Sequence, residues 1–445
     1  MSTNFLEAVK QAGVVGAGGA GFPTHVKLAA EVDLYIANGA ECEPLLQADR
    51  ELMIAAAAEV VRGLEIGMQL TKAKKGIIAL KRKYKRAISA LKEELRHREN
   101  IDLYLLDNYY PAGDEHVLVY EVSGRLVPEG GIPIQVKVVV NNVTTLVNVA
   151  RATFGIPVTS VVVTVAGEIR KPQTFEVPLG TSIGEVLKAA GGPTLDSFAV
   201  IVGGPMMGTV TTDFEKPITK VNNGIVVLPS DHRLIQFKAA HINYLSYRTR
   251  GLCIRCNLCT EVCPRYLLGH DLQPAKIMRA VAWGLKSNAQ VLTNAFLCTG
   301  CGTCTFYGCP MDLDPSGIIQ AVKEQLIAEE VKNPHTSEKI VPHEFHPIRK
   351  IPNSRLIGRL GLISYDKPSP LALNQQITPG IVKIPLKQHI GVPALPLVKK
   401  GEVVEKGMAI GEIPEGSLGA RIHAGISGTI VEISDVIAIR NGTTQ

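Results

Sequence analysis

Eight of the nine cysteines in this 445-residue chain lie in one segment, between Cys253 and Cys309, and only Cys42 stands apart. They form two nearly repeated runs, CIRCNLCTEVCP at 253–264 and CTGCGTCTFYGCP at 298–310. Each run has three cysteines at three-residue intervals and a fourth that precedes a proline. Thiols gathered in one segment indicate ligands for an inorganic group rather than a disulfide framework. This part of the chain must therefore fold around what its thiolates hold.

The spacing within each run is typical of two-cluster ferredoxins, in which the remote fourth cysteine ligates the other cluster. The first predicted [4Fe–4S] cluster is held by Cys253, Cys256, Cys259 and Cys309, and the second by Cys298, Cys301, Cys304 and Cys263. Four residues separate Cys304 from Cys309, one more than in the first run. Structural zinc is the alternative, because CxxC pairs also bind zinc.

Length and composition narrow the remaining possibilities. A chain of this length is expected to form about two to four domains. The N-terminal residues carry no secretory signal, and no apolar run approaches the roughly 20 residues that a membrane span needs, so we expect a soluble cytoplasmic protein. The formal net charge is +6, and its densest basic run is KRKYKR at 81–86. We interpret this run as the solvated face of a helix reaching about Glu99, which gives no indication of nucleic-acid binding.

The texture of the sequence changes along the chain and predicts a multidomain α/β and α+β protein. Helical patterns alternate with apolar runs first, as in an α/β layer structure, and short β-branched segments follow. The cysteine region is helical between its motifs, and a Pro- and His-containing stretch leads to a glycine-rich all-β module. The predicted boundaries are 1–154 (α/β), 155–232 (α+β), 240–332 (clusters), 333–370 (linker) and 371–445 (β module).

The stretch GAGGAGFPTHVK at 16–27 has the GxGxxG spacing of a dinucleotide-binding fingerprint. A Rossmann fingerprint must follow a buried strand, however, and an amphipathic helical pattern precedes this stretch. The glycines could instead let a flat ring or a phosphate approach the backbone. Pro23 suits the first position of a helix whose N-terminus attracts an anion, and Lys27 adds a full charge. A plain glycine-rich turn is the other interpretation.

With NGAECEP at 38–44, YPAGDEH at 110–116 and VNNVTTLVNVA at 140–150, this stretch resembles the flavin- and NADH-binding subunit of respiratory complex I and its relatives, including the C subunit of the Rnf complex. The resemblance implies bound FMN and a site for NADH, with no side chain in a catalytic role. It implies FMN contacts from Gly16, Gly18, Gly19, Lys27, Asn38, Glu41, Asn141 and Asn142, and NADH contacts from Phe22, Glu43 and Glu115. Ala17 departs from the pattern, since the respiratory subunits have arginine there. We interpret Cys42 as an ordinary buried thiol.

The rest of the chain extends this resemblance. The segment after Ile156 is similar to the soluble-ligand-binding β-grasp domain of the family. The C-terminal segment is similar to a barrel-sandwich hybrid module that precedes the flavin domain in Rnf C subunits. It also looks like a biotinyl or lipoyl carrier, but its tip, HAGISG, has no lysine to modify, and we expect His423 to be a surface residue there.

The order of the domains resembles that of the cobalamin reductases of propanediol-utilisation microcompartments. That resemblance implies reduction of cob(III)/cob(II)alamin towards cob(I)alamin inside a bacterial microcompartment. Its implied partners are cobalamin, a corrinoid adenosyltransferase and shell proteins. An Rnf-C-like subunit that passes electrons to another protein is one alternative. A cluster-bearing scaffold with a vestigial flavin site is the other.

Overall fold

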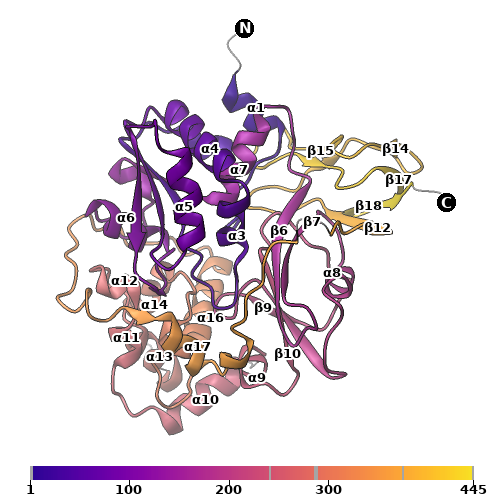
Figure 1. Cartoon of the computed structure of the whole chain (residues 1–445). Helices are drawn as coiled ribbons and strands as arrows, with labels where there is room; N and C mark the ends of the chain where they lie inside the picture. The colour runs from indigo at the N-terminus through magenta and orange to yellow at the C-terminus, as the bar shows by residue number, and fades with distance from the viewer. Residues whose placement is uncertain (1–3, 240–241, 285–288, 373–374, 443–445) are drawn as a thin grey trace.

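The computed structural model describes residues 4–239, 242–284, 289–372 and 375–442. The start of the predicted cluster domain, at residue 240, and the two ends of the chain, 1–3 and 443–445, lie outside the described residues. Figure 1 shows the N-terminal α/β part above the helical cysteine region, with the C-terminal strands at one side. None of the helices in the described ranges is long and apolar enough to cross a membrane.

The N-terminal domain is built on a parallel four-stranded sheet in the order β3-β2-β1-β5. Its strands are β1 (Leu34–Gly39), β2 (Lys75–Lys81), β3 (Ile101–Leu106) and β5 (Val138–Asn142). The near-continuous apolar runs of these strands suit a sheet that is covered on both faces. Alternate strand residues pack against helices on each face, so the sheet has a core on either side. The helices are α1 (Phe5–Gln11), α2 (Thr24–Leu28), α3 (Ala48–Ala55), α4 (Ala57–Thr71), α5 (Lys85–Glu94), α6 (Glu115–Ser123) and α7 (Val143–Ala152), with the 3-10 turn η1 (Pro133–Val136).

The basic run at 81–86 is not one helix face, which corrects the expectation from the sequence. Lys81 ends strand β2 and is fully buried, and α5 begins only at Lys85. Tyr84 is buried as well, between exposed basic neighbours. The run of charged residues hid the end of strand β2 in the sequence pattern, because Lys81, the last residue of that strand, is buried although it is charged.

The second domain is a five-stranded mixed sheet in the order β7-β6-β10-β8-β9. Only β6 and β10 pair in parallel, and the other neighbours are antiparallel. Its one helix, α8 (Ile183–Ala189), begins at a capping box formed by Ser182 and Glu185. The strands are β6 (Ser160–Gly167), β7 (Gln173–Pro178), β8 (Phe198–Val202), β9 (Thr209–Thr211) and β10 (Gly224–Pro229).

The cysteine region consists of short helices around two that pack on each other, α13 (Pro274–Trp283) and α16 (Pro315–Ala328). Both of these helices begin with a proline in the first turn, where the missing N–H costs nothing. The others are α9 (Arg233–Lys238), α10 (Ile242–Leu252), α11 (Leu258–Glu261), α12 (Pro264–Leu267), α14 (Ala289–Thr293), η3 (Asn294–Leu297) and α15 (Thr303–Phe306).

The segment 333–370, predicted as a linker, is packed over much of its length. Strand β11 (Ile351–Pro352) pairs with β4 (Tyr109–Tyr110) of the N-terminal domain. Helix α17 (Asn353–Arg359) and the 3-10 turn η4 (Ile363–Tyr365) follow. Apolar side chains of this segment join a core shared with the first two domains and the cysteine region: Ile351, Leu356, Ile357, Leu360 and Leu362. The segment therefore ties three domains together.

The C-terminal module has two small antiparallel sheets around one apolar core. One sheet has the order β12-β18-β17-β14 and the other β13-β15-β16. The strands are β12 (Ile381–Pro385), β13 (Leu395–Pro396), β14 (Val403–Val404), β15 (Ala409–Glu412), β16 (Ile422–His423), β17 (Gly428–Ile433) and β18 (Val436–Asn441). His423 ends β16 and is buried, so the expectation of a surface histidine was wrong. Burial lowers its pKa to about 3, which keeps the ring neutral.

Candidate functional site

The glycine stretch of the N-terminal domain forms a closed loop that borders a hollow. A bridge between Val15 and Pro23 closes the base of the loop, and the Gly16 N–H donates to the Phe22 carbonyl over 2.9 Å. The hollow is partly open to solvent and has a cavity volume of about 120 Å³. Of the residues implied for FMN and NADH, those lining it are Gly16, Gly18, Gly19, Phe22, Lys27, Asn38, Glu115, Asn141 and Asn142.

The absence of side chains lets this loop lie close to the end of the sheet. A Cβ on Gly18 would stand 3.0 Å from the Asn142 amide nitrogen, whereas a Cβ on Gly19 would meet no atom within 4 Å. Gly21 has φ +75°, a conformation that L residues rarely adopt. The loop thus leaves open backbone facing the hollow, as a flat ring or a phosphate would require.

Three asparagines fix the inner wall of the hollow, at the carboxyl ends of β1 and β5. Asn38 donates to the Gly113 carbonyl over 2.9 Å, and Asn141 donates to the hydroxyl of buried Tyr35 over 2.7 Å. Asn142 caps α7 and also donates to Asp49 over 2.7 Å. Ligands of parallel α/β sheets bind outside the carboxyl ends of the strands, so this is the expected side.

Lys27 supplies the positive charge at the hollow. Its ammonium lies 2.8 Å from the Glu115 carboxylate, and it is the more buried partner, at 18% against 45% exposure. Helix α2 has only five residues and is capped by Pro23, so the predicted helix N-terminus adds little. The attraction for an anion therefore depends on Lys27 and the backbone amides of the loop.

Two acidic residues implied for the nucleotides do not line the hollow. Glu41 is buried and accepts a hydrogen bond from the Asp49 N–H at 3.1 Å. Burial and the neighbouring Asp49 raise the pKa of Glu41. The Glu43 carboxylate accepts from the N–H groups of Met206 and Met207 at 2.8 and 2.9 Å. Glu43 therefore joins the N-terminal domain to the second domain.

The end of strand β2 carries a buried polar group that the sequence did not reveal. The Lys81 ammonium is buried, and no hydrogen-bond partner for it exists among the described residues. Cys42 and Glu41 are its oppositely charged neighbours when they are ionised. Cys42 is half-buried, and burial raises the pKa of its thiol to about 12, which agrees with an ordinary thiol. The apolar run GIIAL directly before Lys81 indicates a buried strand, and it was the feature of the sequence from which the burial of Lys81 could have been predicted.

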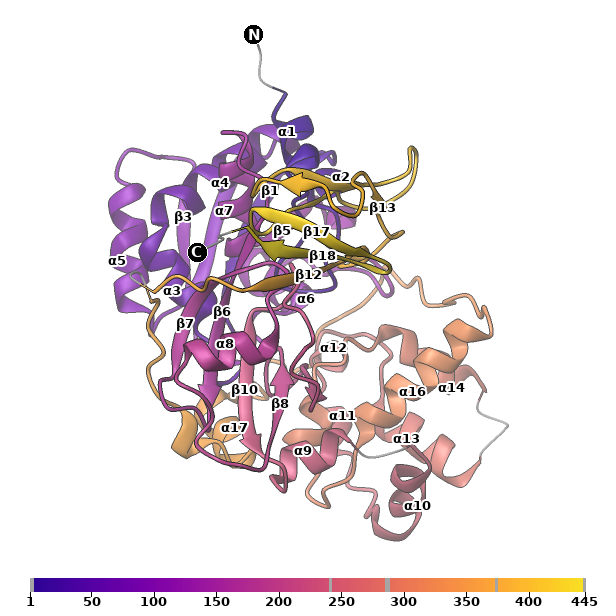
Figure 2. The same ribbon diagram turned by 90° about the vertical axis from the view of Figure 1, so that its right-hand side faces the viewer.

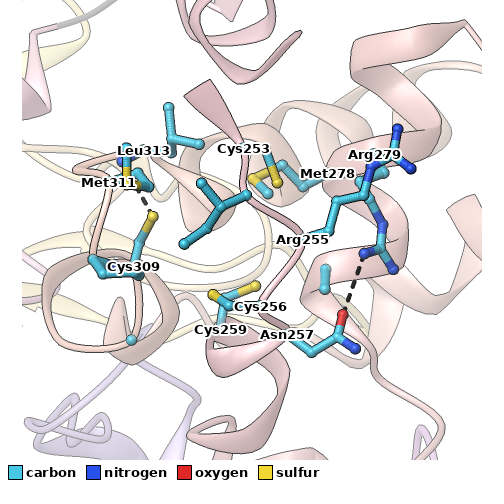
Figure 3. A pocket seen from close by; sticks show the side chains of 14 residues that line it. Cys253, Arg255, Cys256, Asn257, Cys259, Met278, Arg279, Cys309, Met311 and Leu313 are labelled. Atoms are coloured by element: carbon cyan, nitrogen blue, oxygen red, sulfur yellow. Dashed lines mark hydrogen bonds between the residues drawn. The ribbon is translucent and has the colours of Figure 1, made fainter. Parts of the chain in front are cut away.

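The first predicted cluster set surrounds one hollow, which is lined by Cys253, Cys256, Cys259 and Cys309. Figure 3 shows Cys309 on one side and Cys253 on the other, with Cys256 and Cys259 between them. Cys309 comes from the second run, so the chain brings the remote cysteine to the first run. Burial and the other three thiols raise the pKa of Cys259 to about 12.

The second set, Cys263, Cys298, Cys301 and Cys304, is buried throughout. Burial raises the pKa of Cys263 and Cys304, and neighbouring thiols add to this effect: Cys301 and Cys298 at Cys263, and Cys298, Cys301, Cys263 and Cys259 at Cys304. Burial raises the pKa of Cys301 to about 11, so these thiols ionise at neutral pH only beside a metal's charge. Gly300 N–H and the Gln320 amide donate to the Cys298 sulfur at 3.4 Å, as is common around iron–sulfur ligands.

The two runs share a backbone device that the spacing alone did not reveal. Arg255 and Asn257 in the first run, and Gly300 and Gly302 at the equivalent places in the second, all have φ between +59° and +74°. These left-handed residues turn the chain between successive cysteines. Helices α11 and α15 then carry the third cysteine of each run, Cys259 and Cys304.

The four thiols of the first set line one hollow. In the described ranges, no group of three His, Cys, Asp or Glu side chains converges as one metal ion requires. A cubane is held at its corners by separate thiolates, whereas zinc draws its ligands to one point at about 2.3 Å. The arrangement of the first set is the kind that a cubane needs.

The second cysteine set adjoins the N-terminal domain. The Tyr110 hydroxyl donates to the Cys301 carbonyl over 2.8 Å. Arg265 and Asp114 form a buried two-pronged ion pair, at 2.8 and 3.1 Å, between the cysteine region and the N-cap of α6. The hollow for a nucleotide and the thiol sites thus belong to one connected unit.

A flavin-type hollow beside two tetrads of thiols defines the class of a flavin- and iron–sulfur-containing oxidoreductase. Family models support each part: a Nuo51 FMN-binding domain matches residues 9–151, an SLBB domain 162–210, a 4Fe-4S dicluster domain 252–314 and an RnfC barrel sandwich hybrid domain 366–445. These matches confirm the predicted fold class and favour clusters over zinc.

Comparison with known sequences then gives the family. The chain is 42% identical over 431 residues to the cobalamin reductase PduS of Salmonella typhimurium, covering 96% of this chain and 94% of that protein. The identity to cobalamin reductase PduS of Citrobacter freundii is also 42%, over 432 residues, with 96% and 94% covered. The chain belongs to the cobalamin reductase PduS family, which confirms the resemblance seen in the sequence.

More distant relatives share parts of the chain. The C subunit of the Na⁺-translocating ferredoxin:NAD⁺ oxidoreductase complex of Acetobacterium woodii is 37% identical over 265 residues, 58% of this chain and 57% of that protein. A chain of an NAD⁺-reducing [NiFe]-hydrogenase in its H2-reduced state superposes with a TM-score of 0.51 at 24% identity, covering 74% of this chain and 63% of that one. The latter likeness is one of fold.

Proposed function

We propose that the protein is an NADH-dependent oxidoreductase that reduces cobalamin, from cob(III)alamin or cob(II)alamin towards cob(I)alamin, for the regeneration of coenzyme B12. The observation that carries this proposal is the near full-length similarity to cobalamin reductases, which extends through all the modules. We further propose that a corrinoid adenosyltransferase takes the product, and that the protein works inside a propanediol-utilisation microcompartment alongside its shell proteins.

Two kinds of cofactor would supply the redox chemistry when bound: FMN would allow the two electrons of a hydride to be passed on singly, and two [4Fe–4S] clusters would each carry one electron at a time. The residues fit the flavin. Gly16, Gly18 and Gly19 offer approachable backbone, and Lys27 offers a cation for the phosphate. Asn38, Asn141 and Asn142 would offer hydrogen bonds to the ribityl chain of FMN and to the edge of its isoalloxazine ring. Glu41 would act indirectly: it accepts a hydrogen bond from the Asp49 N–H, and the Asp49 carboxylate in turn accepts one from Asn142.

The eight clustered cysteines would ligate the two clusters, in the crossed sets described above. The protein supplies four thiols at each site, and at Cys298 it adds two hydrogen-bond donors that favour electron-rich sulfur. Cys256 is the exposed member of the first set, whereas the second set is buried. The two sites therefore differ in their access to water.

For NADH, the geometry favours Phe22 and Glu115. Both line the hollow, and the exposure of Phe22, 39%, suits an apolar surface for a ring. The contacts of Glu43 with the Met206 and Met207 amides favour a different role, in which it sets the second domain against the nucleotide domain. Its influence on NADH would then be indirect.

One observation favours a second candidate function, electron transfer to a protein partner as in Rnf C subunits. The relatives of that kind match 58% of the chain at 37% identity. The module that matches the RnfC barrel sandwich hybrid domain lies at residues 366–445, after the cluster region, and this order follows the cobalamin reductases.

The test is anaerobic. Purified protein is mixed with NADH and hydroxocobalamin, cob(II)alamin is followed by absorbance, and an adenosyltransferase with ATP traps cob(I)alamin. We expect reduction faster than free FMN achieves, lost in Cys256→Ala and retained in Cys42→Ala. Fast reduction of ferredoxin, with cobalamin no faster than with free FMN, would favour the Rnf-like alternative.

A further inference from the structure

The C-terminal module contacts the glycine loop of the flavin hollow directly. The Ile390 N–H donates a hydrogen bond to the Ala20 carbonyl over 3.2 Å. Gly21 packs so closely on this module that a Cβ there would stand 3.0 Å from His389 Cα and Cβ. Ala20 and Gly21 both line the hollow. Figure 1 shows the strands of the module at one side of the nucleotide domain, and Figure 2 shows the same strands in front of it.

The segment of the module that touches the loop, residues 388–391, is itself held rigidly. The His389 ring is buried, and its Nδ1 and Nε2 lie 3.0 and 3.1 Å from the carbonyls of Ile390 and Ala420. The Ala420 N–H also lies 3.0 Å from Nε2. The contact with the glycine loop therefore comes from a segment that its own hydrogen bonds hold in place.

A second anchor lies at the base of the same loop. The buried Lys220 ammonium donates to the carbonyls of Gly13, in the nucleotide domain, and Arg421, in the C-terminal module, over 2.7 and 2.8 Å. The Lys220 N–H donates to the Gln388 side chain over 3.2 Å. Lys220 of the β-grasp domain thus contacts the chain just before the glycine stretch, at Gly13, and the module at Arg421 and Gln388.

We infer that the FMN site is composite. The module at residues 375–442, through His389 and Ile390, acts together with Lys220 of the β-grasp domain to hold the Ala20–Gly21 half of the glycine loop in its binding conformation. The nucleotide domain supplies the groups that would touch FMN. His389 and Lys220 are positioning residues that act through the loop backbone. Because a loop ordered in advance need not be ordered by the ligand, this contact stabilises the bound state.

The contact also suggests why the module is retained although its tip has no lysine to modify. Residues 388–391 give the module a fixed contact with the glycine loop, in place of the mobile lysine of a carrier domain. This inference depends on flavin binding alone and not on cobalamin as the acceptor, so the two proposals can fail separately.

The test measures FMN affinity in the full chain with its clusters intact. FMN is removed anaerobically, and FMN alone is titrated back while its fluorescence is followed. We expect His389→Ala and Lys220→Met each to raise the Kd about five- to tenfold, as for the loss of one or two buried hydrogen bonds. The visible circular dichroism of bound FMN should change, because the loop beside the ring relaxes. His389→Gln, which can bridge the same carbonyl, should recover part of the affinity.

Ile439→Val is the matched control, since it loosens the core of the same module away from the loop. It should lower the melting temperature and leave both the Kd and the dichroism unchanged. FMN affinity within twofold of wild type in both positioning variants would overturn the inference. An equal loss of affinity in Ile439→Val would overturn it too, because the effect would then follow stability and not position.

Discussion

At the scale of single residues, Lys27 decides how strongly the hollow attracts an anion. It is paired with Glu115 at 2.8 Å, and it faces the same space as the open glycine backbone. A charge-assisted contact to a phosphate is worth about 1.5–3 kcal/mol, so Lys27→Ala should weaken FMN binding about ten- to hundredfold. Lys72→Ala, at an exposed ion pair with Glu31, is the control and should leave affinity unchanged. Wild-type affinity in Lys27→Ala would remove Lys27 from the flavin site.

Lys81 is a residue whose charge opposes folding. Burial lowers its pKa from 10.5 to about 8, so the unfolded chain keeps the proton to higher pH than the folded one. Stability should therefore rise with pH between about 8 and 10.5, and below this range the buried cation costs on the order of 3 kcal/mol. Lys81→Met should raise the melting temperature at pH 7, and its advantage should shrink by pH 9.5. Lys85→Met, at an exposed position nearby, should change neither value, and an unchanged melting temperature in Lys81→Met at pH 7 would contradict this account.

At the scale of elements, the cysteine runs show how short helices and left-handed turns deliver ligands across a domain. Cys309 lies in the second run but lines the hollow of the first. Cys309→Ala should therefore remove the cluster of Cys253, Cys256 and Cys259 and spare the other. Iron and acid-labile sulfide should fall from about eight of each per chain to about four. Cys42→Ala should keep all of them, and a Cys309→Ala protein whose remaining cluster depends on Cys256 would show that the crossing is wrong.

The elements also show what a sequence can predict. Ligand spacing and apolar strands are local patterns, so the two cysteine runs and the alternation of helices with apolar strands could be identified along the chain. Contacts between distant segments leave no such pattern. Ser369 donates its N–H to the Gln47 side chain over 2.8 Å, and Ile390 donates its N–H to the Ala20 carbonyl over 3.2 Å. The packing of segment 333–370 and of the C-terminal module on the glycine loop therefore emerged only from the fold.

At the scale of the whole molecule, the nucleotide and cluster parts are joined by a buried ion pair. Arg265 and Asp114 are 7% and 10% exposed, and Asp114 also caps α6 through the N–H groups of His116 and Val117. Removing one partner of a buried pair typically costs about 3–5 kcal/mol, because the other charge is left without its counter-ion. The caps at Asp114 offset part of this cost.

Arg265→Met should therefore separate two events that are expected to coincide in the wild type, namely release of flavin fluorescence and loss of cluster absorbance during thermal unfolding. The cluster part should unfold first, because it has lost its tie to the larger parallel sheet, and flavin release should follow at higher temperature. Arg349→Met is the matched control, since its ion pair with Glu261 is partly exposed, and such pairs contribute at most about 1 kcal/mol. If both signals shift together in Arg265→Met, the two parts unfold as one unit through their remaining contacts, the Tyr110 hydroxyl to the Cys301 carbonyl among them.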